Sequence, residues 1–222
     1  AGKSTLFNAI AGTFPVDRGT IQLDGKNITS LPDYKRSKFI GRMFQDPLKG
    51  TAPTMTIEEN LALAYMRASS GTNPFSVISK ADRAEFRQRL SQLGLGLEDR
   101  MGSPVGLLSG GQRQALTLLM ATMVTPKLLL LDEHTAALDP ATADKVLTLT
   151  RQIVADHGIT CLMITHNIPS ALSLGNRTIM MKDGSIVLEL GGAQREGLTP
   201  DELLRLFHQQ GISNDRIELS AE

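Results

Sequence analysis

The stretch LLSGGQRQALTLLMATMVTPKLLLLDEHTAALD, from Leu107 to Asp139, decides the fold of this chain. A Ser-Gly-Gly turn opens a predicted helix, Pro126 ends it, and four leucines lead into the acidic pair Asp132-Glu133. Leu128 to Leu131 is apolar at every position, which is typical of a central parallel strand covered on both faces. Open α/β sheets bind ligands at the carboxyl ends of their strands, which is where the acidic pair is predicted to lie.

The Ser-Gly-Gly turn predicts an anion site. Ser109 is a good helix N-cap, because its hydroxyl can accept a hydrogen bond from an amide of the first turn. Gly110 and Gly111 have no Cβ, so another group can approach their backbone closely. The exposed amides and the positive end of the helix dipole favour an anion there. Together with the two carboxylates, the turn indicates a site for nucleotide phosphate and Mg²⁺.

The first residues supply a second phosphate-binding element. The sequence AGKST at 1–5 matches the end of the loop G-x-x-x-x-G-K-[ST] and runs into a helix predicted from Lys3 to about Ile10. Gly2 permits the tight turn, Lys3 can reach the β- and γ-phosphates, and the Ser4 hydroxyl can bind Mg²⁺. The first glycine of the motif and its preceding strand do not appear in the sequence.

Ordered motifs over nearly the whole chain resemble those of the ABC-type ATPases, the nucleotide-binding subunits of ABC transporters. LSGGQ at 108–112 resembles their signature motif, GKST at 2–5 the end of their Walker A motif, and FQDP at 44–47 their Q-loop. LLLLDE at 128–133 resembles their Walker B strand, AALD at 136–139 their D-loop, and His166 in ITHN their switch histidine. The motifs occur in the order that the family has.

One position departs from this pattern, because His134 lies where most of the superfamily has proline. DEHTAALDP at 132–140, together with GTAPTMTIEENLALA at 50–64, resembles a branch of bacterial importer ATPases found with periplasmic binding proteins. His134 could form a hydrogen bond to the following loop or perturb Glu133, and we do not expect it to be catalytic.

The resemblance implies an α/β fold, a P-loop NTPase of the ABC-ATPase type with a mainly parallel sheet and an antiparallel β portion. Residues 1–49 and 126–210 would form a RecA-like core, residues 50–125 an inserted α-helical subdomain carrying the signature, and residues 211–222 a polar tail. The chain is expected to be truncated at its N-terminus, without the first strands and the aromatic residue that stacks on adenine.

The resemblance also implies a role for each motif residue. The expected catalytic residues are Glu133 as general base, with His166 and Gln45. The expected Mg²⁺ ligands are Ser4, Gln45 and Asp132. The expected ATP contacts are Gly2, Lys3, Ser4, Thr5, Ser109, Gly110, Gly111, Gln112 and Asp139.

In the family, the signature of one subunit faces the P-loop of a second, so that a homodimer encloses two ATP molecules. Ser109 and Gly111 would then contact the γ-phosphate bound by the other copy, and Asp139 would lie across the interface. The implied partners are transmembrane permease subunits and a periplasmic substrate-binding protein. The implied cargo is a small solute such as an amino acid, with the chain on the cytoplasmic face of the inner membrane.

Composition agrees with this interpretation. The 222 residues contain 23 Lys and Arg and 23 Asp and Glu, so the formal net charge is zero and no nucleic-acid binding is expected. The single Cys161 lies in the apolar run ITCLMIT and is expected to be an inert core residue. We find no signal-peptide pattern and no apolar run long enough to span a bilayer, so membrane association is expected through a partner.

Local patterns predict the other elements. Asp-Gly pairs predict hairpin turns at Asp24-Gly25 and Asp183-Gly184, and Thr-x-x-Glu patterns predict two capped helices. The predicted segments are a hairpin at 19–28, a strand at 39–45 ending in Gln45, helices from Thr56 and over 80–93, a polar loop at 69–74, a helix from Asp139-Pro140 to about 156, a strand at 159–164, a hairpin at 177–190 and a last helix capped by Thr199 and Glu202.

Three other functions stay open on sequence alone. A soluble ABC protein of DNA repair or translation would share the motifs, but it usually carries a coiled-coil insertion or two cassettes, and neither is visible. An exporter or lipid-extracting ATPase would have nearly the same residues. A non-catalytic module is the third alternative, because half of the P-loop is missing, and we expect weak or no ATP turnover from the chain as given.

Overall fold

The computed structural model describes residues 2–68 and 78–209. The polar loop predicted at 69–74 and the polar tail at 211–222 lie outside the described residues. The chain divides into a larger unit, residues 9–162, and a smaller unit, residues 1–8 with 163–222. Each unit is described by itself.

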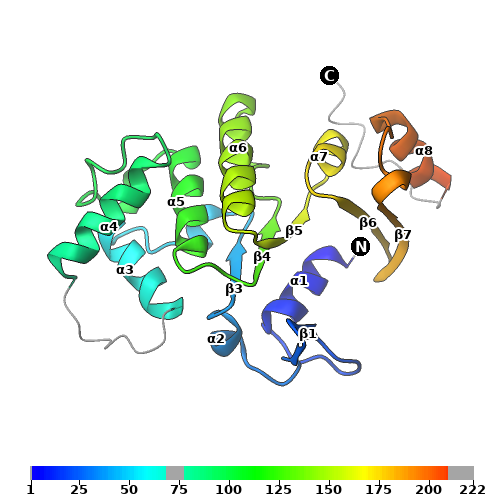
Figure 1. The fold of residues 1–222 in the computed structure, drawn as a ribbon, viewed down its shortest axis with the longest axis horizontal. Coiled ribbons are helices and arrows are strands. Elements are labelled where there is room, and N and C mark those ends of the chain that lie inside the picture. The colour runs from blue at the N-terminus through cyan, green and yellow to red at the C-terminus, as the bar shows by residue number, and fades with distance from the viewer. Residues whose placement is uncertain (1, 69–77, 210–222) are drawn as a thin grey trace. The chain divides into compact units, whose positions relative to one another are not determined.

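A parallel pair of strands lies at the centre of the larger unit (Figure 1). Strand β3 (Ile40–Met43) pairs in parallel with β4 (Leu128–Asp132), with Ile40 opposite Leu128 and Met43 opposite Leu131. The strand order is β3-β4-β5, where β5 is Thr160–Ile164. Leu129, Leu130 and Leu131 are at most 1% exposed. The predicted α/β fold with a buried parallel strand is confirmed.

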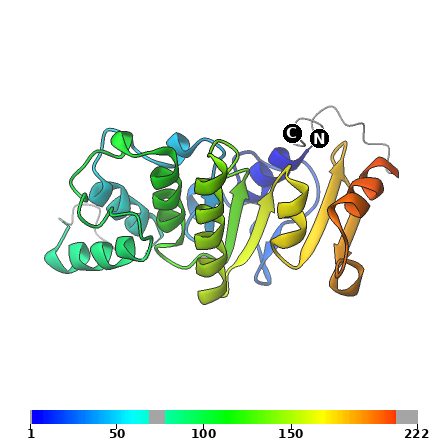
Figure 2. The same ribbon diagram turned by 90° about the horizontal axis from the view of Figure 1, so that it is seen from above.

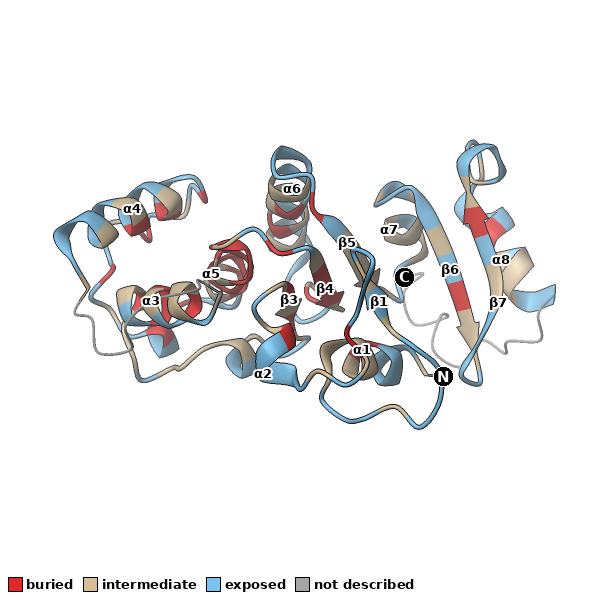
Figure 3. Cartoon of the chain, turned by 60° about the horizontal axis from the view of Figure 1, so that its bottom comes forward, coloured by how far each residue is buried: buried red, intermediate tan, exposed pale blue. Residues whose placement is uncertain are grey.

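In the described part of the chain between β3 and β4, three α-helices are present. They are α3 (Ile57–Ala68), α4 (Lys80–Ser91) and α5 (Gly110–Thr122), and the short 3₁₀ helices η1 (Pro47–Gly50) and η2 (Val105–Leu107) precede α3 and α5. Figure 3 shows that buried residues dominate α5, whereas α3 and α4 have exposed faces. The helices share one apolar cluster that includes Leu61, Phe86, Leu90, Leu116 and Leu119. The helical segment therefore has a core of its own.

Local capping and turn chemistry set the element boundaries as the sequence predicts. Thr56 and Glu59 form a reciprocal cap at the start of α3, and Asp139 caps α6 (Pro140–Asp156). The strands β1 (Gln22–Leu23) and β2 (Lys26–Asn27) pair around Asp24-Gly25, both with positive φ. Helix α5, however, ends at Thr122, before Pro126 rather than at it. The helix stops at its last buried turn.

Arg36 is buried at the end of helix α2 (Asp33–Arg36) and ties two segments together. Its guanidinium donates hydrogen bonds of 2.7–2.8 Å to the carbonyl oxygens of Ala9, Ile10, Thr29 and Leu31. Two of these carbonyls lie in the last turn of α1 (Lys3–Ala11), whose final carbonyls have no partner within the helix. A positive charge there also complements the helix dipole. Arg36 thus closes the C-terminal end of α1.

Among its described residues after β5, the smaller unit has an antiparallel hairpin and the helices α7 and α8 (Figures 1 and 2). Strands β6 (Arg177–Lys182) and β7 (Ser185–Gly191) pair around Asp183-Gly184, and α8 (Pro200–Gln209) is capped by Thr199 and Glu202. Both elements were predicted. Helix α7 (Ile168–Ser173) was not, although Asn167 caps it through the Ser170 amide. A short 3₁₀ helix, η3 (Gly192–Gln194), follows β7.

Two further sequence predictions bear on the core and on the membrane. Burial raises the pKa of the Cys161 thiol to about 11, so at neutral pH the thiol is protonated and weakly nucleophilic. Within residues 2–68 and 78–209, every helix falls short of the length and apolar character that crossing a bilayer requires.

Replacing Arg36 by methionine in the full-length polypeptide is expected to lower the free energy of unfolding by about 3 kcal/mol or more, because several buried carbonyls lose their donor. Arg87→Met is the matched control, since Arg87 forms an exposed ion pair with Asp99 and should contribute little. Urea denaturation measures both. Equal stabilities for the two variants would contradict the role assigned to Arg36.

Candidate functional site

The signature turn is held by a reciprocal cap at the start of α5. The Ser109 hydroxyl accepts a hydrogen bond from the Gln112 amide, and the Gln112 side chain accepts one from the Ser109 amide, both at 3.2 Å. Gln112 also donates to the carbonyl of Leu95 at 3.4 Å. Ser109 and Gly110 are exposed, so their outer face is open to a ligand. The sequence predicted Ser109 as a cap, but the part of Gln112 in that cap was missed.

Gly111 is required by packing inside the chain. It is buried, and a Cβ placed on it would lie 2.1 Å from Cγ2 of Thr142 in α6. Gly110 is also close to a neighbour, since its Cβ would lie 3.3 Å from Leu138. Figure 2 shows α5 and α6 running side by side. The group that approaches this glycine closely is therefore the next helix of the same chain.

Gln45 and Asp132 leave the same edge of the sheet on adjacent strands. Asp132 is the last residue of β4, and β3 ends at Met43, opposite Leu131. Gln45 follows two residues later and is exposed, and Asp46 then caps η1 through the Leu48 amide at 2.9 Å. Burial lowers the pKa of Arg42 in β3, and the charge of Asp132 opposes that shift. The structure thus brings the predicted Gln45 and Asp132 together at one edge.

Glu133 has an unusual backbone. Its φ is +44°, in the left-handed region that residues with a Cβ rarely adopt. Its carbonyl accepts a hydrogen bond from the Ala136 amide at 3.0 Å, which closes a tight turn after β4. Such a conformation costs on the order of 1 kcal/mol or more and persists only where the surroundings enforce it. The candidate general base therefore lies at a constrained position.

His134 is buried beside this turn. It is 3% exposed, its carbonyl accepts a hydrogen bond from the Gln114 side chain of α5, and its ring Nε2 lies 3.3 Å from Thr150 Oγ1 of α6. Burial lowers the pKa of His134 to about 4, so the ring is neutral at neutral pH. Sequence reasoning missed Gln114 and Thr150. Gln114 could have been noticed only as a polar residue within the largely apolar helix α5, and no sequence pattern marked Thr150.

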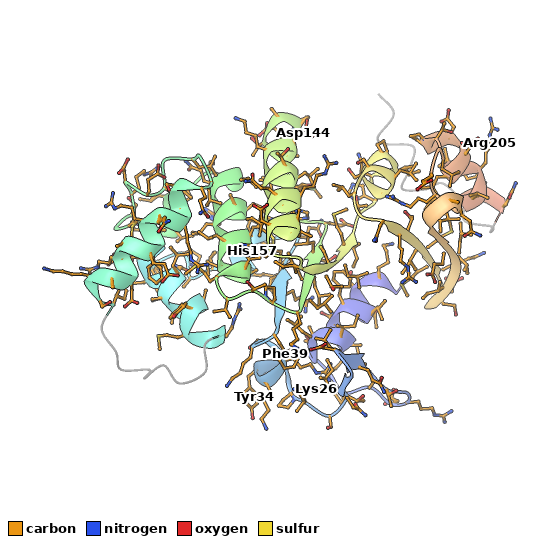
Figure 4. The ribbon with its side chains drawn as sticks, in the orientation of Figure 1. Lys26, Tyr34, Phe39, Asp144, His157 and Arg205 are labelled. Carbon is orange, nitrogen blue, oxygen red and sulfur yellow. The ribbon has the colours of Figure 1, made fainter. Side chains whose placement is uncertain are left out.

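Asp139 ends the loop that Glu133 begins. Its carboxylate accepts a hydrogen bond from the Thr142 amide at 3.1 Å, and hydrogen bonds from Thr142 hold its pKa below the usual range. Asp139 is exposed and thus both caps α6 and faces outward. Figure 4 labels Asp144 toward one end of α6 and His157 at the other. The His157 amide donates to carbonyls of the last turn of this helix. His157, for which the sequence suggested no role, lies far along the helix from Asp139.

The smaller unit holds the other motif residues. Helix α1 begins at Lys3 directly after Gly2, which has a φ of +101°. Lys3, Ser4 and Thr5 are exposed, and the first amides of a helix have no partner within it. His166 is exposed after the end of β5, next to Thr165, whose hydroxyl accepts a hydrogen bond from the Asn167 amide. A helix start and a strand end thus present the residues predicted to contact phosphate.

A pocket lies beside β3 in the larger unit. Its walls come from α2, β3, η1, α3 and α5, and they include the cationic side chains Arg42, Lys49 and Arg67. Phe44 and Tyr34 also line it, and the Arg42 guanidinium lies 4.5 Å from the centre of the Phe44 ring. Tyr34 is 64% exposed and is labelled in Figure 4. The pocket thus combines positive charge with aromatic surface, and its lining residue Phe44 directly precedes Gln45 in the sequence.

No group of three or more His, Cys, Asp and Glu side chains forms a metal site by itself among the described residues. Ser4, Gln45 and Asp132 offer a hydroxyl, an amide oxygen and a carboxylate. These hard oxygen donors are the chemistry that Mg²⁺ prefers, and such sites are usually completed by phosphate oxygens and water. Each of the three donors, taken by itself, therefore has the chemistry that suits Mg²⁺.

Comparisons with known proteins agree with the geometry. Residues 1–136 match the protein family described as ABC transporter. The chain is 44% identical over 206 residues to a tyrosine transport ATP-binding protein of Clostridioides difficile (strain R20291), covering 93% of this chain and 81% of that protein. It is 36% identical over 189 residues to the aliphatic sulfonates import ATP-binding protein SsuB 2 of Agrobacterium fabrum (strain C58 / ATCC 33970), covering 85% of this chain and 64% of that protein.

A solved structure shares the fold. It is a dimeric ATP-binding cassette in a post-hydrolysis state bound to ADP and Pi, with a TM-score of 0.71 and 28% identity, covering 85% of this chain and 80% of that one. The family match covers more than half of the chain and includes strand β4. The chain therefore belongs to the ABC transporter family and is an ATP-binding cassette that acts as an ATPase.

Proposed function

We propose that this chain hydrolyses ATP to power the import of a small solute across a bacterial inner membrane. The observation that carries the proposal is the sheet edge of the larger unit, where β3 and β4 deliver Gln45, Asp132 and Glu133 side by side. Import, rather than export, is supported by the relatives named for tyrosine transport and sulfonate import.

In the proposed reaction, Lys3 and the first amides of α1 bind the β- and γ-phosphates of ATP. Ser4, Asp132 and Gln45 would hold Mg²⁺, which when bound neutralises phosphate charge. Glu133 acts as the general base and accepts a proton from the attacking water. Gln45 orients that water and His166 donates to the γ-phosphate. Each residue acts by holding charge or a proton at a fixed place.

The second half of each ATP site comes from another copy of the chain. Ser109 and the exposed start of α5 at Gly110 face the γ-phosphate bound by the partner copy, and Asp139 lies at the same interface. Leu107, just before the signature, is 70% exposed, so its side chain is available to a second copy. A signature that binds only the triphosphate gives the differential affinity that a switch needs. The solved cassette that is dimeric with ADP and Pi bound supports dimerisation as such.

The pocket beside β3 is our candidate docking surface for the permease. Its lining residue Phe44 directly precedes Gln45, so a loop inserted there would press on the segment that holds a catalytic residue. The lining has three cationic side chains, Arg42, Lys49 and Arg67, against the single carboxylate Asp33, and this excess of positive charge favours a loop that carries acidic residues. The chain would thereby be held at the cytoplasmic face of the membrane, with a periplasmic binding protein on the far side.

We propose an amino acid as the cargo, on the strength of the tyrosine transport relative. In a transporter reconstituted with its permease and binding protein, L-tyrosine should raise the ATPase rate and labelled tyrosine should enter the vesicle lumen. If tyrosine and other amino acids leave the ATPase rate unchanged, or if a sulfonate raises it instead, an amino acid is not the cargo. Outward movement would instead favour an exporter.

Glu133→Gln in the full-length protein is expected to lower the ATPase rate constant by about 10²-fold or more, because the variant loses the proton acceptor. ATP affinity should change little, since the amide keeps the size of the side chain. Glu196→Gln, at an exposed position far along the sequence from the motifs, is the control and should keep its rate. Normal turnover by Glu133→Gln would refute the assignment of the general base.

A further inference from the structure

The turn that carries Glu133 has an anchor on each side. Helix α5 begins at the signature turn, and its side chain Gln114 donates a hydrogen bond to the carbonyl of His134. Helix α6 begins after Asp139, and its side chain Thr150 meets the ring of His134. All three anchoring residues are at most 6% exposed. One buried residue, next in sequence to Glu133, therefore touches both helices.

The direction of the ring contact follows from hydrogen-bond accounting. The Thr150 hydroxyl donates its single proton to the carbonyl of Val146 at 2.8 Å. It can therefore only accept from the histidine ring, so Nε2 of His134 carries the proton and donates. The Gln114 contact is also one-directional, because only the amide NH₂ can donate to a carbonyl. The two anchors thus fix both the main chain and the ring of His134.

These two contacts lie next to a residue whose backbone conformation is unfavourable by itself. Glu133 has a left-handed φ of +44°, and its carbonyl is held by the Ala136 amide. An unsupported chain would relax toward a more favourable φ and would swing the Glu133 carboxylate away from its place. Immobilising the next residue between two helices removes that freedom. A general base misplaced by about 1 Å can cost roughly 10²-fold in rate.

We propose that His134 is the positioning residue of this ATPase: clamped between Gln114 and Thr150, it holds the strained turn that aims the Glu133 carboxylate at the attacking water. The inference rests on the proposed function, in which Glu133 is the general base. His134 itself touches no substrate. Because Ser109 caps the start of α5, the clamp also links the signature turn to the base through a single helix.

The test compares steady-state ATPase kinetics and melting temperatures of variants in the full-length transporter. His134→Leu removes the ring donor, and we expect kcat to fall about 10-fold or more with the KM for ATP within about 3-fold. His134→Gln, whose amide NH₂ can reach the Thr150 hydroxyl, should recover most of kcat. A loss of stability alone would not give this split between kcat and KM, nor the recovery.

Thr150→Val tests the same contact from the other side and should also lower kcat with KM retained. Thr148→Val is the matched control, because Thr148 lies on the same helix and its hydroxyl likewise donates to the carbonyl four residues earlier, but it is exposed. Thr148→Val should leave kcat unchanged. If His134→Leu does not fold, Thr150→Val decides the question.

Single-turnover measurements in the Glu133→Gln background complete the test. Without the base there is nothing to aim, so adding His134→Leu should cause little further loss of rate. The proposal is overturned if His134→Leu or a folded Thr150→Val keeps kcat within about 2-fold of wild type while Glu133→Gln abolishes turnover. It is equally overturned if His134→Leu slows both backgrounds by the same factor. Normal turnover by Glu133→Gln alone would instead remove the proposed function.

Discussion

The close approach of α5 to α6 is the constraint on which the rest of the larger unit depends. Gly111 leaves no room for a Cβ against Thr142, so the two helices meet within one turn of both of their N-termini. Those N-termini carry Ser109 and Asp139, the residues that we assign to the partner-facing side of the ATP site. Packing therefore fixes the spacing of two functional groups before any ligand is present.

Buried polar side chains supply the orientation that apolar packing cannot. Apolar contacts stabilise in proportion to area and are insensitive to direction, whereas a buried donor without an acceptor is costly, which makes each such contact directional. Arg36 uses this property at the end of α1. His134 and Gln114 use it beside the general base. In each case one side chain fixes the end of an element that carries a motif residue.

Elements set by short-range chemistry could be predicted from the sequence, and contacts between distant residues could not. The caps at Ser109, Thr56 and Thr199 and the turn at Asp24-Gly25 involve residues at most three apart, so pattern and spacing reveal them. Strand β4 was evident from its unbroken leucines. By contrast, the hydrogen bonds from Arg36 to α1, and the contacts of His134 with Gln114 and Thr150, join residues that are 16 to 27 positions apart.

The same division applies to the candidate site. Motif order predicted Lys3, Ser109, Asp132, Glu133 and His166 as site residues, because each motif is contiguous. It could not show that Gly111 packs against Thr142 or that Glu133 has a left-handed backbone, since both depend on the three-dimensional packing of helices and strands. Helix α7 is too short, at six residues, for periodicity to indicate.

The central claim is that one ATP is held by Lys3 of one copy and Ser109 of another, and nucleotide-dependent dimerisation tests it most directly. Ser109→Asp keeps a good N-cap but places a carboxylate against the γ-phosphate, and Ser109→Asn is the neutral control. In the Glu133→Gln background with Mg-ATP, sedimentation should show dimers for the Asn variant and monomers for the Asp variant, with ATP affinity unchanged in both. Equal dimerisation by the two variants would contradict the account.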